Sequence, residues 1–129
     1  MITPIFAAVL SLIFIFLSVR TLRLRRRLKI AVGDSGNLEM LRAVRAHGNF
    51  AEYVPLTLLL IYFLEQAQAQ SWLVYALGGV LTLGRVSHSY GLSQLNETFF
   101  FRVFGMACTF STIGTSALYL LVSRFFWLG

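Results

Sequence analysis

Charged residues are scarce in this sequence, and so are the side chains that most often act as nucleophiles or metal ligands. Of the 129 residues, only five are acidic, two are histidine and one is cysteine. Two histidines and one cysteine without ligand spacing argue against a metal or haem site. A single cysteine forms no disulfide within the chain, so Cys108 leaves the redox compartment open. We expect Cys108 to be a small buried side chain, not a nucleophile.

Apolar side chains are what the chain has in excess. They make up 57% of the residues, and the mean hydropathy of +0.74 is too high for an ordinary soluble domain. Residues 2–19 carry no charge and are long enough to cross the hydrocarbon core of a bilayer. No basic segment precedes this run and no clear cleavage site follows it, which favours an uncleaved anchor over a signal peptide.

The basic residues are unevenly placed. The net charge is +6, and more than half of the 11 basic residues form one cluster: Arg20, Arg23, Arg25, Arg26, Arg27 and Lys29. Directly after an apolar span, such a cluster is typical of the cytoplasmic end of a membrane helix beside anionic lipid. We do not expect nucleic acid as a partner, because no separate soluble domain is visible to hold it.

Three polar breaks divide the chain into four helices. The breaks are residues 32–37, 66–71 and 93–98, and the helices are expected at about 2–30, 38–66, 72–92 and 99–123. The third apolar run ends at Gly84 and is too short to cross a membrane alone. The third helix must therefore continue through Arg85 and His88. We therefore predict one domain over residues 1–129, an all-α four-transmembrane-helix bundle, with the second helix bent at Pro55.

The loop charges predict the orientation of this bundle. The first loop has at least six basic residues, the second none and the tail one, so the first and third loops should face the cytoplasm. The unusual polar residues of all four helices then lie at the cytoplasmic side, which is typical of a site. They are Arg23, Arg42, Arg45, Asn49, Glu52, Tyr53, Arg85, His88 and Arg102.

Five of these residues share one face of the second helix. With Arg42 at 0°, helical geometry puts Arg45, Asn49, Glu52 and Tyr53 at roughly 300°, 340°, 280° and 20°. The arginines could hold the carboxylates of a small zwitterionic ligand, with Glu52 on its ammonium and Asn49 on a peptide group. The alternative is a self-satisfied network in which Glu52 pairs with an arginine to hold helices together. The helix alone does not choose between them.

The same helix carries a pattern that resembles a known family. The pattern is Arg42-x-x-Arg45-Ala46-x-x-Asn49-x-x-Glu52-Tyr53-x-Pro55, with Arg85-Val86-x-His88 on the third helix. It resembles the membrane-associated proteins in eicosanoid and glutathione metabolism, the MAPEG superfamily. This superfamily includes microsomal glutathione transferases, leukotriene C4 synthase and microsomal prostaglandin E synthase. The compact chain is similar to the small bacterial members, and the resemblance covers its whole length.

The resemblance implies a homotrimer in a bacterial inner membrane, with glutathione bound between subunits and accessible from the cytoplasm. Its glutathione-binding positions match Arg45, Asn49, Glu52, Tyr53, Arg85 and His88. Arg42 matches a motif arginine whose direct contact is less certain. Arg102 is the best match to the arginine that activates the thiol, although its spacing from His88 requires a small insertion in the third loop.

Two further positions are implied to come from a neighbouring subunit. His47 matches a polar position of the adjoining subunit, and Arg23 matches, more loosely, a first-helix arginine that reaches in from a neighbour. On the helix His47 falls at roughly 140°, almost opposite the other five groups. In a symmetric trimer one face can serve its own site and the other the neighbour's. The alternative for His47 is a satisfied interfacial histidine.

The chain departs from the family pattern in two places. Leu92 stands where the prostaglandin and leukotriene branches carry a tyrosine, and Tyr90 would point about 200° away on a helix. The run Phe99-Phe100-Phe101 before Arg102 is also unusual; plain packing at the membrane interface is the simpler interpretation, and an apolar ledge for a hydrophobic second substrate is the alternative.

The expected chemistry is that of a glutathione transferase or peroxidase, with Arg102 stabilising the thiolate against a lipophilic electrophile. A non-catalytic protein that binds lipid, glutathione or a partner is the main alternative, because of Leu92. A small multidrug exporter also has four spans, but it resembles a pattern with an essential carboxylate in the first helix. Residues 2–19 contain none. Nothing in the sequence selects the second substrate.

Overall fold

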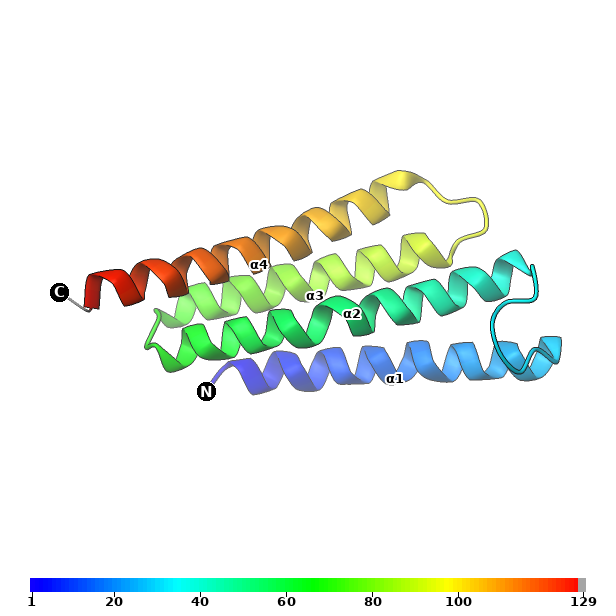
Figure 1. Ribbon diagram of the computed structural model, residues 1–129, viewed down its shortest axis with the longest axis horizontal. Coiled ribbons are helices and arrows are strands. Elements are labelled where there is room, and N and C mark those ends of the chain that lie inside the picture. Colours follow the sequence, from blue (N-terminus) through cyan, green and yellow to red (C-terminus); the bar gives the residue numbers. More distant parts are fainter. Residues whose placement is uncertain (128–129) are drawn as a thin grey trace.

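The computed structural model describes residues 1–127, and over that range the chain is four helices joined by short loops (Figure 1). They are α1 (Thr3–Leu28), α2 (Leu38–Gln66), α3 (Ser71–Ser93) and α4 (Phe99–Trp127). These bounds follow the expected ranges closely, and the largest difference is at the end of α4, expected near residue 123. The fold class is therefore all-α, as predicted.

Local chemistry explains where α1 ends and where α2 begins. Lys29 adopts a left-handed backbone conformation with φ of 55° and ends α1. Gly33 and Gly36 also have positive φ values, 69° and 73°, which glycine adopts without steric cost. Asn37 then caps α2, because its side-chain oxygen accepts a hydrogen bond from the Met40 amide at 2.9 Å. Pro55 lies inside α2, which continues through it.

Apolar side chains lie both inside the bundle and over its outside. The core includes Leu10, Phe50, Ile61 and Leu81, each at most 1% exposed. The most apolar segments of α1 and α4 have mean hydropathies of 2.3 and 1.4, yet only 17% and 22% of their residues are buried. Water would oppose so much exposed apolar surface, whereas lipid accepts it. Among the described residues, α2 and α3 contain no uninterrupted segment as apolar as these two, because polar residues interrupt their apolar runs.

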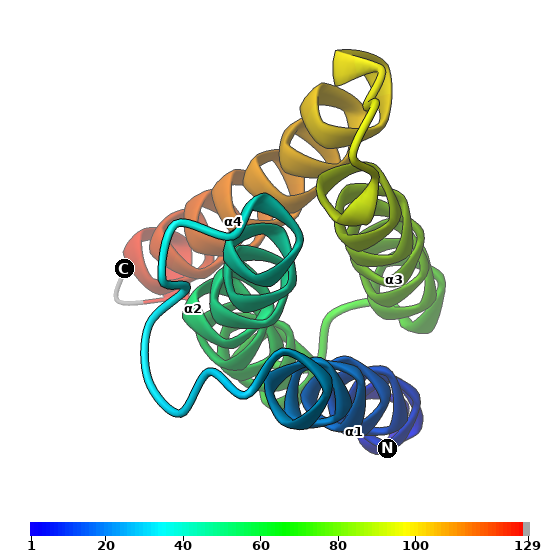
Figure 2. The ribbon, with the colours of Figure 1, turned by 90° about the vertical axis from the view of Figure 1, so that its right-hand side faces the viewer.

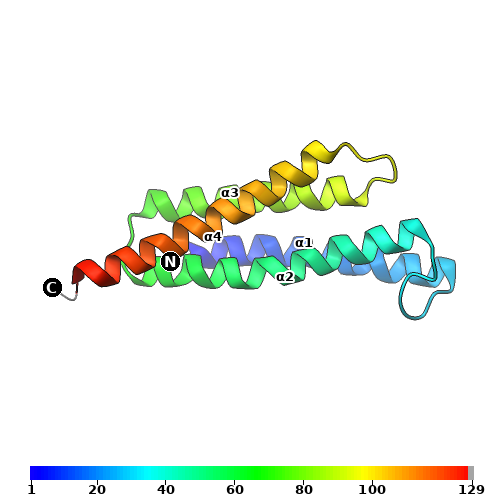
Figure 3. The same ribbon diagram turned by 45° about the horizontal axis from the view of Figure 1, so that its top comes forward.

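The helices α2 and α3 form the middle of the bundle. Each contacts all three other helices, whereas the backbones of α1 and α4 do not approach each other within the described residues. Seen from the end, α1 and α3 lie on the side of the bundle away from α4's carboxyl end (Figure 2). The helix α4 runs obliquely across α2 and α3 (Figure 3). Residues of α2 can therefore meet partners from every other helix.

Two glycines let α3 and α4 approach until their backbones touch. A Cβ atom on Gly105 would lie 2.5 Å from the Gly84 carbonyl oxygen and 2.5 Å from the Cβ atom of His88. A Cβ atom on Gly84 would lie 2.5 Å from that of Cys108. The expectation that Cys108 is buried was too strong, because it is only half-buried beside this contact. The crossing brings Arg85 and His88 against α4.

Candidate functional site

The most deeply buried charged side chain of the bundle is Arg85 on α3, whose exposed fraction is 0%. Its Nη2 atom donates to the Asn49 side-chain oxygen on α2 at 2.6 Å. Its Nη1 atom donates to the Thr109 hydroxyl on α4 at 3.4 Å. The His88 Nδ1 atom lies 3.4 Å from Nη2. The guanidinium therefore joins α2, α3 and α4 at one point.

Aromatic rings from α2 complete the surroundings of Arg85. Its guanidinium carbon lies 5.6 Å from the centre of the Phe50 ring and 5.9 Å from that of Tyr53, within the range of cation–π attraction. The Tyr53 ring packs edge-on against Phe110 at 5.7 Å. The Nε atom of Arg85 has no hydrogen-bond partner. Four predicted site residues, Asn49, Tyr53, Arg85 and His88, thus lie together within a single chain.

A second cluster forms around Glu97, in the loop between α3 and α4. One oxygen of Glu97 lies 3.1 Å from Nη1 of Arg42 on α2 and 2.8 Å from Nη1 of Arg102 on α4. Arg42 also donates to the Leu92 carbonyl oxygen at 3.4 Å. The Glu97 side chain is 7% exposed, and its other oxygen has no partner. One carboxylate therefore ties two predicted site arginines from different helices to the loop.

Two opposing effects act on the Glu97 carboxyl group. Burial raises its pKa, but the hydrogen bonds from Arg102 and Arg42 and the charges of these arginines lower it by more. The net pKa lies below the ordinary glutamate value of 4.5. Glu97 is therefore ionised at neutral pH and neutralises part of the arginine charge.

Arg45 and Glu52 lie on the outward side of α2. Their closest atoms, Nη1 and Oε1, are 3.6 Å apart, and each side chain is 53% exposed. Both residues belong to α2, so this pair does not hold helices together as the alternative required, and the contact is long and open. The polar face of α2 is thus divided: Asn49 and Tyr53 point into the bundle, Arg42 points to the loop, and the Arg45–Glu52 pair points outward.

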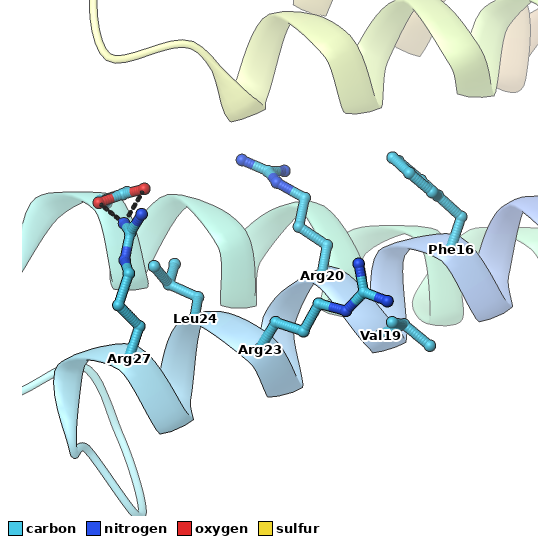
Figure 4. Close-up of a pocket in the computed structure, with 7 residues that line it drawn as sticks. Phe16, Val19, Arg20, Arg23, Leu24 and Arg27 are labelled. Atoms are coloured by element: carbon cyan, nitrogen blue, oxygen red, sulfur yellow. Dashed lines mark hydrogen bonds and ion pairs between the residues drawn. The ribbon is translucent and has the colours of Figure 1, made fainter.

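His47 and Arg23 lie apart from both clusters. The His47 ring stacks on Phe14 of α1 with 4.8 Å between ring centres, and its Nε2 atom lies 2.9 Å from the Ser18 hydroxyl oxygen. Arg23 is exposed on α1, in a hollow of about 290 Å³ that Arg20 and Arg27 also line (Figure 4). A single chain does not bring these two residues to the others.

Leu92, at the position where two branches of the family carry a tyrosine, and the nearby Tyr90 point in different directions. Leu92 is buried, whereas Tyr90 is 54% exposed and packs edge-on against Phe101 at 5.2 Å. Tyr90 therefore points away from the position of Leu92. Phe99 and Phe100 are each 68% exposed, so the apolar run before Arg102 lies on the surface of the bundle.

Sequence reasoning missed Glu97 and Thr109 as members of the two clusters. A signal for Glu97 was present, because it is the only acidic residue after Glu65, in a half of the chain that also holds Arg85 and Arg102. Thr109 gave no such signal, since it is one of several hydroxyl residues in an apolar helix. Among the described residues, no group of three or more histidine, cysteine or acidic side chains is placed to hold a metal ion.

Comparison with known proteins agrees with this architecture. The family model described as the MAPEG family matches residues 3–122. Inner membrane protein YecN of Escherichia coli strain K12 is 35% identical over 113 residues, which is 88% of this chain and 85% of that protein. Its counterpart in Escherichia coli O6:H1 matches equally well. No solved structure matches the chain. The match over nearly the whole chain shows that this four-helix membrane bundle belongs to the MAPEG family.

Proposed function

We propose that the chain binds glutathione at the end of the bundle that holds the two clusters, and uses it as a transferase or peroxidase on lipophilic electrophiles. The observation that carries the proposal is the convergence of Arg42 and Arg102 on one buried carboxylate of a loop. Two guanidinium groups held this closely, with only one negative charge between them, favour a further anion. Glutathione supplies two carboxylates and, when activated, a thiolate.

The contacts within one chain suggest how the ligand would be held. The Arg45–Glu52 pair is open and 3.6 Å apart, so it can exchange its internal contact for a carboxylate and an ammonium group of the ligand. The Asn49 amide is oriented by Arg85. Tyr53 and His88 lie beside that guanidinium. The buried cluster would thus serve as a rigid wall and the exposed pair as the docking point.

One of the remaining two residues supports a homotrimer in an inner membrane, with the site open to the cytoplasm. Arg23 is exposed on α1, away from the clusters of its own chain, whereas His47 already contacts Phe14 and Ser18 of α1. A neighbouring copy could use Arg23, because rotational symmetry puts the same surface of each subunit beside a different surface of the next. The basic first loop favours the cytoplasmic side for this end, and YecN is named as an inner membrane protein.

The protein needs to lower the pKa of the glutathione thiol only slightly. A free thiol has a pKa of about 8.5, and lowering it to about 7 requires roughly 2 kcal/mol, which a nearby guanidinium in a partly dry site can supply. Arg102 is 38% exposed and already positioned by Glu97, so we assign it this role. The exposed Phe99 and Phe100 offer an apolar approach from the lipid for the second substrate.

Two reactions are compatible with such a thiolate. In conjugation, sulfur attacks an electrophilic carbon, a C–S bond forms, and the leaving group departs with the electron pair. In peroxide reduction, sulfur attacks the terminal oxygen of a lipid hydroperoxide, the O–O bond breaks, and the alkoxide takes a proton to become an alcohol. A second glutathione then converts the sulfenic acid to a disulfide and water. Neither reaction needs a nucleophile from the protein.

A non-catalytic glutathione- or lipid-binding protein is the second candidate. Leu92 favours it, because this buried position has no side-chain hydroxyl and offers only its carbonyl oxygen, which Arg42 engages. Binding without turnover of any electrophile would be its signature.

One experiment separates the two candidates. Glutathione binding is titrated by calorimetry in detergent, thiolate formation is followed by ultraviolet absorbance, and conjugation is measured with a chloronitrobenzene. We expect Arg102→Ala to bind glutathione but lose the thiolate absorbance, and Arg45→Ala and Glu52→Gln to lose most of the binding. Arg124→Ala, exposed near the other end of α4, is the control. Unchanged absorbance in Arg102→Ala would remove Arg102 from this role, and no binding by the unmodified protein would overturn the proposal.

A further inference from the structure

A groove of about 630 Å³ lies between α1 and α3, on the side of the bundle that α4 does not cover. Its walls are largely apolar and include Leu12, Phe16 and Val86. None of the predicted glutathione residues lines it. In a membrane such a groove is filled by a lipid chain or by another protein chain, because a void would leave its walls without contacts.

The bottom of the groove holds a polar group without a partner. Ser89 lines the groove, is 6% exposed, and its hydroxyl oxygen has no hydrogen-bond partner. Unpartnered buried hydroxyls are rare, because losing the hydrogen bonds to water is costly. An ester or hydroxyl oxygen of a molecule in the groove would supply the missing partner.

One end of the groove is basic. Arg20 lines it and donates a hydrogen bond across its mouth to the Ser93 hydroxyl. Figure 4 shows the Arg20 side chain pointing from α1 toward the carboxyl-terminal end of α3. The groove meets the hollow that Arg23 and Arg27 line, because Arg20 and Phe16 belong to both. An apolar channel therefore opens onto a row of cations.

Within residues 1–127, none of the ion pairs involves Arg20. All five acidic side chains of the sequence are in the described residues, and each of them has other partners. They are Asp34, Glu39, Glu52, Glu65 and Glu97. A negative charge at the mouth of the groove has to come from another molecule.

The length of the groove matches the thickness of one leaflet of a bilayer. From Leu12 to Arg20 a helix rises about 12 Å, and one leaflet of the hydrocarbon core is about 15 Å thick. The apolar walls therefore extend over the depth of one leaflet, and Arg20 lies where lipid headgroups begin. This polarity fits a lipid better than a helix of another copy, which would need an acidic side chain at the level of Arg20.

We propose that the groove between α1 and α3 is a binding site for a phospholipid with an anionic headgroup, with an acyl chain along Leu12, Phe16 and Val86 and the phosphate at Arg20. The site is separate from the glutathione clusters, so it stands whether or not glutathione binds. The bound lipid would fill the gap between two helices that contact each other only sparsely, and it would make the bundle sensitive to the headgroup composition of the membrane.

Fluorescence quenching by brominated lipids tests the site. A Trp72→Phe, Trp127→Phe background receives one tryptophan in the groove, Val86→Trp, or one on the exposed surface of α4 outside the groove, Val103→Trp. Each protein is placed in phosphatidylcholine vesicles containing increasing brominated phosphatidylglycerol or brominated phosphatidylcholine. At Val86→Trp we expect half-maximal quenching at a roughly fivefold lower fraction of the anionic lipid, from about one arginine contact. At Val103→Trp the two lipids should quench equally.

Two substitutions locate the headgroup. Arg20→Gln should abolish the preference for the anionic lipid at Val86→Trp, whereas Arg26→Gln, an exposed arginine outside the groove, should preserve it. Equal quenching by both lipids at Val86→Trp would overturn the proposal without reliance on any arginine variant. Weaker quenching at Val86→Trp than at Val103→Trp by both lipids would also overturn it, because it would mean that the groove excludes lipid.

Discussion

Arg85 shows how a membrane bundle can hold a fully buried cation without a carboxylate. Its hydrogen-bond partners are an amide oxygen, a hydroxyl, an imidazole and the Met106 thioether, from three helices, and two aromatic rings lie beside the guanidinium. The shortest contact, to Asn49 at 2.6 Å, is the one whose loss should matter most. Removing only the acceptor of a buried donor lowers the free energy of unfolding more than replacing both partners with apolar groups.

A double-mutant cycle tests this account of Arg85. Asn49→Leu should lower the free energy of unfolding by about 2–3 kcal/mol, because it leaves a charged donor unsatisfied. Arg85→Met with Asn49→Leu should cost less than the sum of the single changes, since donor and acceptor are then removed together. Thermal unfolding in detergent provides the values. Strict additivity would mean that the two side chains are not coupled.

Glu97 is the other residue whose effect can be isolated. Its pKa lies below 4.5 in the folded protein, because the hydrogen bonds and charges of Arg102 and Arg42 outweigh burial. A lowered carboxyl pKa adds stability that is fully present above the unfolded-state pKa and is lost as pH falls through the folded-state pKa. We therefore expect Glu97→Gln to destabilise the protein near neutral pH by about 1–3 kcal/mol.

The pH dependence distinguishes this mechanism from a local packing defect. The difference in unfolding temperature between Glu97→Gln and the unmodified protein should be constant at neutral pH and shrink at acid pH below 4.5, where the carboxylate becomes protonated. Glu39→Gln, whose carboxylate pairs with Arg27 at an exposed position, serves as the control and should have little effect. A Glu97→Gln difference that persists unchanged at low pH would contradict the mechanism.

At the scale of elements, the crossing of α3 and α4 decides the geometry of both clusters. The helices meet through Gly84 and Gly105, and the residues on either side of this contact, Arg85, His88 and Arg102, belong to the clusters. In lipid, helix association depends on close packing of small residues rather than on the hydrophobic effect. A single methyl group at the crossing should therefore change the site as well as the stability.

Gly105→Ala tests the importance of this crossing. Its Cβ atom would meet backbone and Cβ atoms at 2.5 Å, so α4 must move, and we expect a loss of about 1–3 kcal/mol in the free energy of unfolding together with weaker glutathione binding. Gly114→Ala lies in the same helix with nothing within 4 Å and should be neutral or slightly stabilising. Equal effects of the two substitutions would show that the crossing has no special role.

At the scale of the whole molecule, the asymmetry of charge predicts how the bundle is inserted. Basic residues are concentrated in the last turns of α1, next to the loop that follows it, and the loop after α2 has none. Loops rich in lysine and arginine stay in the cytoplasm. The same asymmetry would put the arginine clusters on the side of the membrane where cellular glutathione is available.

Cysteine labelling measures this orientation. In a Cys108→Ser background, a membrane-impermeant maleimide should label Gln68→Cys in intact bacterial cells but label Ser35→Cys only after permeabilisation. Both positions are exposed loop residues outside the helices. Labelling of Ser35→Cys in intact cells, with protection of Gln68→Cys, would reverse the orientation and remove the cytoplasmic site from the proposal.

The element boundaries and the polar face of α2 were accessible from the sequence, because both depend on local periodicity. The first helix ends before a loop of glycine, aspartate, serine and asparagine, and the second ends at a run of glutamine and alanine. The polar side chains Arg42, Arg45, Asn49, Glu52 and Tyr53 share a face through helical geometry alone. The opposite position of His47 was correct for the same reason, since it packs on α1.

Helix periodicity could not assign partners. It predicted that Arg42, Asn49 and Glu52 line one wall. In the bundle Arg42 pairs with a loop carboxylate, Asn49 accepts a hydrogen bond from a buried arginine, and Glu52 forms an exposed ion pair. These choices depend on how α2 is rotated against α3 and α4, and that rotation is seen only in contacts between residues far apart in sequence, such as Asn49 with Arg85 and Arg42 with Glu97.

By itself, the sequence determined that this protein is a four-helix membrane bundle with its polar groups at one end, because hydropathy and charge act residue by residue along the chain. Only the tertiary structure decided that Glu97 joins Arg42 to Arg102, that Arg85 is buried without a carboxylate, and that α1 and α3 leave a lipid-sized groove. The physical reason is that close packing and ion pairing are pairwise properties. They exist only once the helices have been brought together.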